Sequence, residues 1–223
     1  NTSDWIELYN NGSEPVLLDG WHLTDDEDNL CKWSFPPETV LAAGKYLIVF
    51  ASAQSIDDYR DGDGYLHTNF ALGKDGEYLA LVDPYGRVAH QYAPCFPPQE
   101  ADISYGLWQG QMRYFAIPTP GRENKEAFLG FVAATVHSHE RGFYSEPFEL
   151  KIQCDTPDVR IRYSVDGSEP TDVGRRVYDP EYPLLITTTT QIRSVAFKAG
   201  WKTGSITTHS YIFVDDVAYQ GQS

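Results

Sequence analysis

The residues from His67 to Asp83 constrain the fold most, because they place two tight turns around one short apolar segment. Lys74-Asp75-Gly76 predicts the first turn, since Asp-Gly supplies the positive-φ backbone that a tight turn needs. Asp83-Pro84-Tyr85-Gly86 predicts the second. Glu77–Val82 lies between them and therefore predicts a strand, which we expect to pair with Val88–Tyr92 across the second turn.

Other short segments continue this strand-and-turn pattern. Tyr46–Phe50 is a continuous apolar run and predicts a central strand buried on both faces. Ile103–Trp108 and Met112–Phe115 predict a hairpin around Gln109-Gly110-Gln111. The one helical candidate is Ala53–Tyr59, and no long 3.6-residue period occurs, which argues against an α/β enzyme fold and predicts an all-β protein.

A turn-rich, charged segment, Pro118–Lys125, predicts a linker between two domains of residues 1–125 and 126–223. Val159–Val165 alternates cleanly, with Ile161 and Tyr163 expected inside and Arg160, Arg162 and Ser164 outside. Four further strands are expected in the second domain: Phe131–Val136, Phe148–Cys154, Gln191–Phe197 and Ile206–Phe213. The fold class predicted is two β-sandwich domains in tandem.

The acidic balance of the chain excludes one large class of partners. The net charge is −15, from 32 acidic and 17 basic residues, so a phosphate backbone would be repelled and nucleic-acid binding is not expected. No segment reaches the run of about 20 apolar residues that spans a bilayer, so membrane insertion is not expected either. The chain starts at Asn1 without Met, and we interpret it as part of a longer protein.

Two acidic segments are candidate calcium sites, because calcium takes several carboxylate or carbonyl oxygens in one loop. The first offers Asp25, Asp26 and Asp28, and the second Asp57, Asp61 and Asp63. The alternative for both is a solvated acidic loop, and the second lacks the distal Glu of a complete calcium loop. Calcium is the one cofactor that the sequence leaves as a candidate.

Histidines and nucleophiles are present without the framing that catalysis needs. His137-Ser138-His139-Glu140 places alternate histidines on one face of a strand, but no third transition-metal ligand is indicated, which favours a structural role. No G-x-S-x-G elbow and no phosphate-binding glycine loop occurs. We therefore expect no catalytic activity and assign no catalytic residue.

The aromatic residues, 14% of the chain, raise a second kind of function. Trp108 and Trp201 stand beside glycine-containing turns and are candidates for stacking on sugar rings, with core packing as the alternative. Trp5, Trp21 and Trp33 are expected in the core.

The first half of the chain resembles the lamin-tail domain, in the form found in large secreted bacterial proteins. The segments that carry the resemblance are Asp4–Asn10, Leu18–Asp25, Trp33–Pro36, Val40–Phe50, His67–Asp83 and Pro118–Asn124. The resemblance covers roughly residues 1–125 and implies a sandwich fold without a known catalytic site.

The second half resembles the small β-sandwich at the C-terminus of chitobiase and β-hexosaminidases, which is Ig-like. His139–Tyr144, Ile161–Thr171 and Ile192–Lys198 carry the resemblance, and Tyr163-Ser-Val-Asp-Gly-Ser-Glu-Pro-Thr171 is its most specific part. The catalytic barrel of those enzymes has no counterpart here, so no glycosidase activity is implied. The order of the two modules is typical of secreted, multi-domain bacterial proteins.

A secreted compartment permits disulfides, and the chain has three cysteines. We predict a bridge between Cys31 and Cys95, both in loops of the first domain, and a buried free thiol at Cys154; three free thiols are the alternative. The function expected is that of a non-catalytic structural or interaction module at the cell surface or outside the cell. Its expected partners are neighbouring domains of the parent protein, and a polysaccharide or a cell-surface protein. The alternative is a carbohydrate-binding accessory module of a polysaccharide-degrading system.

Overall fold

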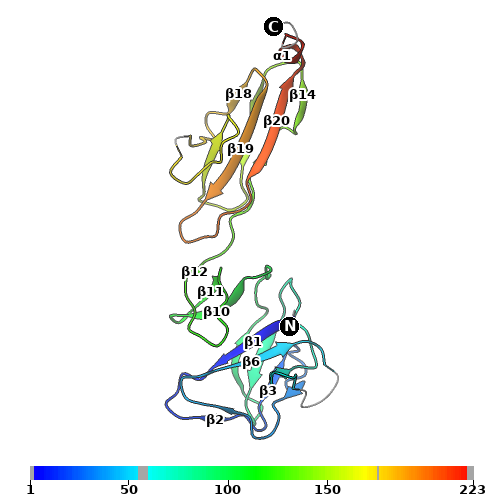
Figure 1. Ribbon diagram of the computed structural model, residues 1–223, viewed down its shortest axis with the longest axis vertical. Coiled ribbons are helices and arrows are strands. Elements are labelled where there is room, and N and C mark those ends of the chain that lie inside the picture. The colour runs from blue at the N-terminus through cyan, green and yellow to red at the C-terminus, as the bar shows by residue number, and fades with distance from the viewer. Residues whose placement is uncertain (1–2, 55–59, 175, 220–223) are drawn as a thin grey trace. The chain divides into compact units, whose positions relative to one another are not determined.

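A computed structural model describes residues 3–54, 60–174 and 176–219 and divides the chain into two units, 1–127 and 128–223 (Figure 1). The boundary lies two residues after the one expected at residue 125. Within the described ranges the regular structure is strand except for one six-residue helix, α1 (Val214–Tyr219), so the all-β prediction is confirmed. The predicted helix at Ala53–Tyr59 falls mostly outside the described residues.

The first unit is built from short strands. They are β1 (Asp4–Tyr9), β2 (Val16–Leu17), β3 (His22–Thr24), β4 (Trp33–Ser34), β5 (Val40–Leu41), β6 (Tyr46–Ala51), β7 (Leu66–His67), β8 (Leu79–Val82), β9 (Val88–Tyr92), β10 (Ser104–Trp108) and β11 (Gln111–Phe115), followed by β12 (Ala127–Phe128) at the boundary between residues 127 and 128.

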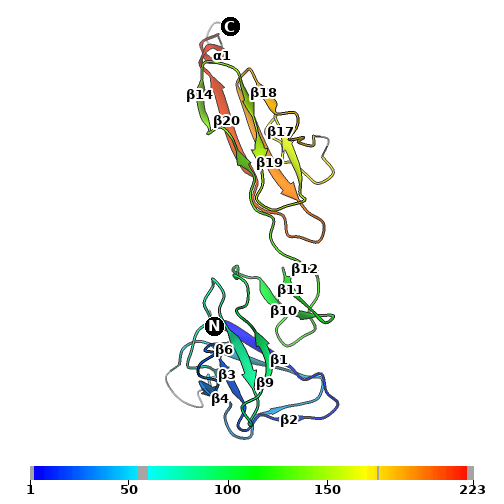
Figure 2. The same ribbon diagram turned by 180° about the vertical axis from the view of Figure 1, so that it is seen from behind.

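Two sheets of the first unit face each other across its core (Figures 1 and 2). One has the order β1-β6-β7 and the other β4-β3-β8-β9. Smaller sheets are formed by β2-β5 and by β10-β11-β12. The core side chains come from both large sheets and from the loops, and they include Ile6, Leu23, Trp33, Phe35, Val49, Leu66, Phe70, Leu79 and Phe96.

The predicted turns are confirmed. The amide of Gly76 donates to the carbonyl of Gly73, and the amide of Gly86 donates to that of Asp83. Glycine is required at position 76, because φ is +92° and an added Cβ would lie 2.1 Å from the carbonyl oxygen of Phe96. Both expected hairpins form, β8 with β9 and β10 with β11. The turn of the second is shorter than predicted, with Gln109 and Gly110 both at positive φ, as a two-residue type I′ turn requires.

The prediction for Tyr46–Phe50 is half wrong. The segment is the central strand β6, but it is buried on one face only. Val49 and Ala51 are in the core, whereas Tyr46, Ile48 and Phe50 are half-buried on the opposite face of the sheet. An apolar run does not reveal whether a second layer covers the other face, and here aromatic side chains shield it in part.

The second unit contains the remaining strands. They are β13 (Val136–His137), β14 (Gly142–Tyr144), β15 (Phe148–Leu150), β16 (Ile152–Gln153), β17 (Arg160–Ser164), β18 (Leu184–Ile186), β19 (Thr190–Phe197) and β20 (Thr207–Phe213). The largest sheet has the order β14-β20-β19-β17, and the two-stranded sheets β15-β18 and β13-β16 contribute to the same core (Figure 2). Leu150, Ile186, Ile192 and Tyr211 are at its centre.

Three expectations for this unit need correction. The strand expected over Phe131–Val136 does not form, because the amides of Val132 and Ala133 donate to the carbonyl of Lys202 and the hydroxyl of Thr156 instead of to one partner strand; β13 begins only at Val136. Ser164, predicted to face solvent, is buried. Its hydroxyl donates to the carbonyl of Ser168, 2.6 Å away, and this hydrogen bond satisfies the polar group in the interior. The strand expected over Phe148–Cys154 is divided at Lys151 into β15 and β16, which pair with different partners, β18 and β13. No helix within the described ranges has the length and apolar content to cross a membrane.

Candidate functional site

The first acidic loop is organised by contacts within the protein. Asp25 forms an ion pair with Lys32 at 2.6 Å. Asp26 Oδ1 accepts from the amide of Asp28, 3.0 Å away, while Asp28 itself is exposed. The carboxylate of Asp25 is therefore in an ion pair, that of Asp26 is in an Asx turn, and that of Asp28 faces solvent.

In the second acidic loop, Asp61 contacts a histidine that in turn contacts a serine. Asp61 Oδ1 accepts from the amides of Asp63 and Tyr65, and Asp61 Oδ2 lies 3.2 Å from His67 Nε2. The other ring nitrogen of His67 is 2.7 Å from Ser52 Oγ. Burial alone would raise the pKa of Asp61, but the hydrogen bonds that its carboxylate makes with Tyr65, His67 and Asp63 outweigh burial and lower the pKa. Asp57 lies outside the described residues.

Within residues 3–54, 60–174 and 176–219, no three His, Cys, Asp or Glu side chains converge as metal ligands. Asp25, Asp26 and Asp28 therefore do not direct their carboxylates at one common point, and Asp61 and Asp63 do not form a group of three ligands with a further side chain in these ranges. Calcium binding at either loop remains a prediction.

The structure does not contain the predicted bridge between Cys31 and Cys95, and all three cysteines are free. Cys31 precedes β4 and Cys95 follows β9, which are the opposite edges of the sheet β4-β3-β8-β9. Three strand spacings amount to about 14 Å, against a Cα separation of at most roughly 7 Å in a disulfide. Cys154 is half-buried, with its thiol 3.3 Å from the carbonyl of Ala133.

The two tryptophans proposed for sugar stacking belong to different units. Trp108 ends β10 and is half-buried. Trp201 packs on Gly130, where an added Cβ would be 2.8 Å from the ring, and Lys198 Nζ lies 4.8 Å from its centroid. Of the tryptophans expected in the core, Trp33 is buried and Trp21 packs against the core, whereas Trp5 is on the opposite face of β1 from the core residue Ile6.

His137 is the centre of a buried hydrogen-bond network in the second unit. Its Nε2 is 2.8 Å from Ser194 Oγ, and its Nδ1 is 3.0 Å from the hydroxyl of Tyr211. Thr135 extends the network through Ser194. Burial, with the neighbouring His209 adding to it, lowers the pKa of His137 to about 4, so the ring is neutral at pH 7. This explains the His137-Ser-His-Glu140 motif as a structural one.

Both serine–histidine contacts lack features that nucleophilic catalysis needs. Ser194 is fully buried, so no substrate reaches its hydroxyl. Beside Ser52, the amides of Ala53 and Gln54 already donate to the carbonyls of Phe70 and Thr68. They are therefore not free to stabilise an oxyanion.

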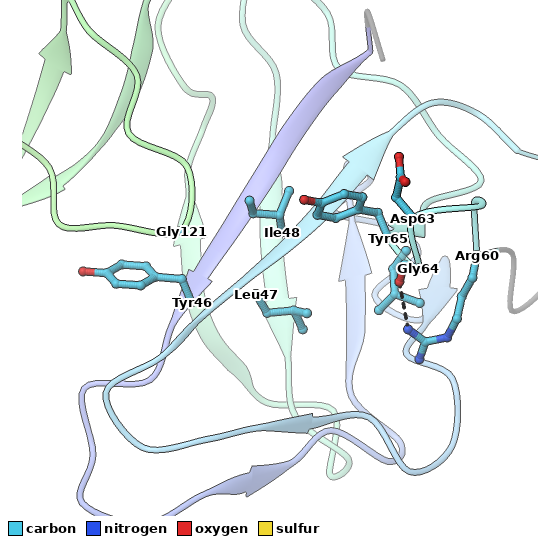
Figure 3. A pocket seen from close by; sticks show the side chains of 9 residues that line it. Tyr46, Leu47, Ile48, Arg60, Asp63, Gly64, Tyr65 and Gly121 are labelled. Carbon is cyan, nitrogen blue, oxygen red and sulfur yellow. Dashed lines mark hydrogen bonds between the residues drawn. The ribbon is translucent and has the colours of Figure 1, made fainter.

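A pocket of about 340 Å³ opens on the outer face of the sheet β1-β6-β7 (Figure 3). We call it the tyrosine pocket, and its lining residues are Tyr46, Leu47, Ile48, Arg60, Asp63, Gly64, Tyr65, Leu66 and Gly121. Figure 3 shows Ile48 between the two tyrosines, with Asp63 and Arg60 on the side of Tyr65. This size is at the lower end of the range for small-molecule sites.

The strand period brings these side chains together. Tyr46, Ile48 and Phe50 alternate with the inward residues of β6, and their cross-strand partners on β1 are Tyr9, Glu7 and Trp5. Tyr9 stacks on Tyr46 with ring centroids 4.6 Å apart, and Tyr65 meets Phe50 edge to face at 5.3 Å. The result is a half-exposed aromatic surface beside a pocket.

Glu7 and Arg60 position the two rims of the tyrosine pocket. Glu7 Oε2 accepts from the amide of Gly121 at 2.5 Å, which holds the loop around residue 121 against β1. Burial raises the pKa of Glu7, and the hydrogen bond from Gly121 acts in the opposite direction. Arg60 Nη1 donates to the carbonyl of Gly64 at 3.4 Å and so closes the loop that carries Asp63 and Tyr65 (Figure 3).

Sequence reasoning missed the tyrosine pocket. The period-2 alternation of Tyr46, Ile48 and Phe50 was visible, but the pairing of β1 with β6 and the position of the loop at residues 60–66 were not. Of the predicted site residues that the structure describes, only Asp63 lines the pocket.

Two comparisons bear on the families. Residues 1–94 match the family model described as Lamin Tail Domain, and residues 139–208 match the one described as Chitobiase/beta-hexosaminidase C-terminal domain. The two resemblances and their order are confirmed, as is the prediction of tandem Ig-like β-sandwiches. Both families are non-catalytic. No curated protein is significantly similar to the chain.

Proposed function

We propose that this chain, with a lamin tail domain followed by a chitobiase-type C-terminal domain, is a non-catalytic interaction module of a larger bacterial protein, secreted or exposed at the cell surface. The observation that carries the proposal is that each unit has its own hydrophobic core. Modules of this kind position or present neighbouring domains. The acidic charge of −15 suits a solvated surface and disfavours nucleic acid.

The test is whether the two units fold separately. Cleavage or expression at the boundary near residues 125–128 is expected to give two folded β-rich fragments whose melting transitions reproduce those of the whole chain. Aggregation of both fragments would contradict the proposal. So would turnover of a chromogenic glycoside or a polysaccharide by the purified chain, if it disappeared on mutation of one named side chain.

A second candidate function, carbohydrate binding, is favoured by one observation, the tyrosine pocket on the first unit. Aromatic faces beside hydrogen-bonding groups suit a sugar ring, which has apolar C–H faces and a polar hydroxyl edge. In this case the module would hold a polysaccharide for an associated enzyme. Binding without turnover is the result that favours it over a spacer.

Calcium remains part of the proposal as a stabilising ion, with Asp25, Asp26 and Asp28 as first candidates and Asp57, Asp61 and Asp63 as second. Binding to the folded state would raise the melting temperature by mass action. Identical melting curves in millimolar calcium and in excess chelator would remove calcium from the proposal.

A further inference from the structure

We propose that the tyrosine pocket is a binding site for a neutral polysaccharide, with Tyr65 and Tyr46 as stacking platforms and Asp63 as an acceptor for sugar hydroxyls. This rests on the carbohydrate-binding candidate above and assigns it to particular residues. It moves the site away from Trp108 and Trp201.

The two tyrosines present ring surface where a ligand can reach it. Tyr65 is 41% exposed and Tyr46 is half-buried, and both line the same pocket on either side of Ile48 (Figure 3). Tyr65 is fixed by its edge-to-face contact with Phe50, and Tyr46 by stacking on Tyr9. Rings held in place before binding lose little conformational entropy when a ligand stacks on them.

The polar groups of the pocket suit hydroxyls. Asp63 is exposed at the pocket wall, and a carboxylate accepts hydrogen bonds from two adjacent hydroxyls of a sugar. Arg60 supplies donors beside it. Apolar Ile48 between the tyrosines faces the C–H surface of the ring (Figure 3).

Charge decides between classes of polysaccharide. The chain carries a net charge of −15, and Asp63 lines the pocket while Glu7 bonds its Gly121 rim. Sulfated or uronate chains would be repelled. Neutral chains of hexose or N-acetylhexosamine units carry no such penalty.

The experiment is affinity electrophoresis of the whole chain through gels that contain β-glucan, mannan, soluble glycol-chitin or, as acidic counterparts, alginate and dextran sulfate, all with a chelator to exclude calcium effects. The expected result is retardation in at least one neutral gel and none in the acidic gels. Tyr65→Ala is expected to weaken binding about tenfold, the size of one lost aromatic contact. Tyr65→Phe keeps the ring and is expected to bind, and Asp63→Asn to bind more weakly.

Tyr85→Ala is the matched control, because Tyr85 is 83% exposed on the β8–β9 turn of the same unit, outside the pocket. It is expected to bind like the unmodified chain. Failure of every neutral gel overturns the inference, and so does binding that survives Tyr65→Ala or is lost in Trp108→Ala or Trp201→Ala. Release of reducing ends from the same polysaccharides would instead overturn the non-catalytic function, so the two failures are distinguishable.

Discussion

Each unit buries one histidine against a serine, but the two histidines differ in the group at the other ring nitrogen. His67 of the first unit contacts Ser52 and the carboxylate of Asp61. His137 of the second unit contacts Ser194 and the phenol of Tyr211. The pKa of His137 is lowered to about 4 by burial, whereas in the first unit the lowered pKa is that of the Asp61 carboxylate, so the two units are expected to respond differently to acid.

The difference also shows what each histidine does in its fold. Asp61 begins the loop that carries the pocket residues Asp63, Gly64 and Tyr65, so His67 fixes this loop against β6 and β7. His137 joins β13 to β19 and β20 and lies inside the sandwich. The contacts of His67 position a surface loop, whereas those of His137 satisfy buried polar groups inside the core.

The largest expected effect is acid destabilisation of the second unit through His137. The folded pKa of about 4 lies below the unfolded value of about 6.5, so between these values the unfolded state binds more protons. Stability therefore falls as the pH is lowered from about 6.5 to about 4, by about 3 kcal/mol in total. Urea unfolding followed by amide signals of residues 128–213 measures it, and His137→Gln, which does not titrate, should lack this part of the pH dependence.

Removing the serine partner of His137 comes next. Ser194→Ala leaves the ring nitrogen of His137 without its partner in a fully buried place, while the Thr135 hydroxyl keeps the backbone carbonyl of residue 194, and should cost about 2 kcal/mol of unfolding free energy. Thr208→Ser, at an exposed position on β20, is the control and should change little. An equal loss in both variants would mean that the network contributes nothing particular.

The corresponding change in the first unit should have a smaller effect. Ser52 is only half-buried, so Ser52→Ala leaves a site that water can partly satisfy, and about 1 kcal/mol is expected. Urea denaturation of Ser52→Ala and of Ser194→Ala under the same conditions at pH 7 allows a direct comparison of their unfolding free energies. A larger loss for Ser52→Ala than for Ser194→Ala would reverse the proposed contrast between the units.

The smallest effect is expected from Asp61. Its folded pKa is lowered, so its contribution is present above the unfolded value near 3.8 and is lost as the pH falls through the folded value. Asp61→Asn should therefore weaken the first unit at pH 7 and leave it unchanged at the lowest pH. Melting curves at pH 7 and pH 2.5 test this, and a difference that grows toward acid would contradict it.

Much of the fold could be predicted because local chemistry specifies it. Asp75-Gly76 and Asp83-Pro84-Tyr85-Gly86 form the turns expected of them, and the strands on either side of the second turn, β8 and β9, pair as a hairpin. Both families were recognisable from the residues at these turns and strands. The helix α1 was missed, since six residues are too few to show a helical period.

Sites could be predicted far less well. The composition of the acidic loops favours calcium, but Asp25 pairs with Lys32 and Asp61 with His67, and composition alone does not predict how these nearby side chains are oriented. The predicted disulfide is absent from the structure, where Cys31 lies in the loop before β4 and Cys95 in the loop after β9, the opposite edge strands of one sheet.

The sequence by itself determined the class of fold, the number of units and the positions of the main turns. These depend on φ preferences and on a period of two residues, both of which act over a few neighbours. Only the tertiary structure decided which face of β6 is covered, which histidine has a carboxylate partner, and that Tyr46 and Tyr65 share a pocket. Strand order and loop placement bring such residues together across the chain, and no local preference encodes them.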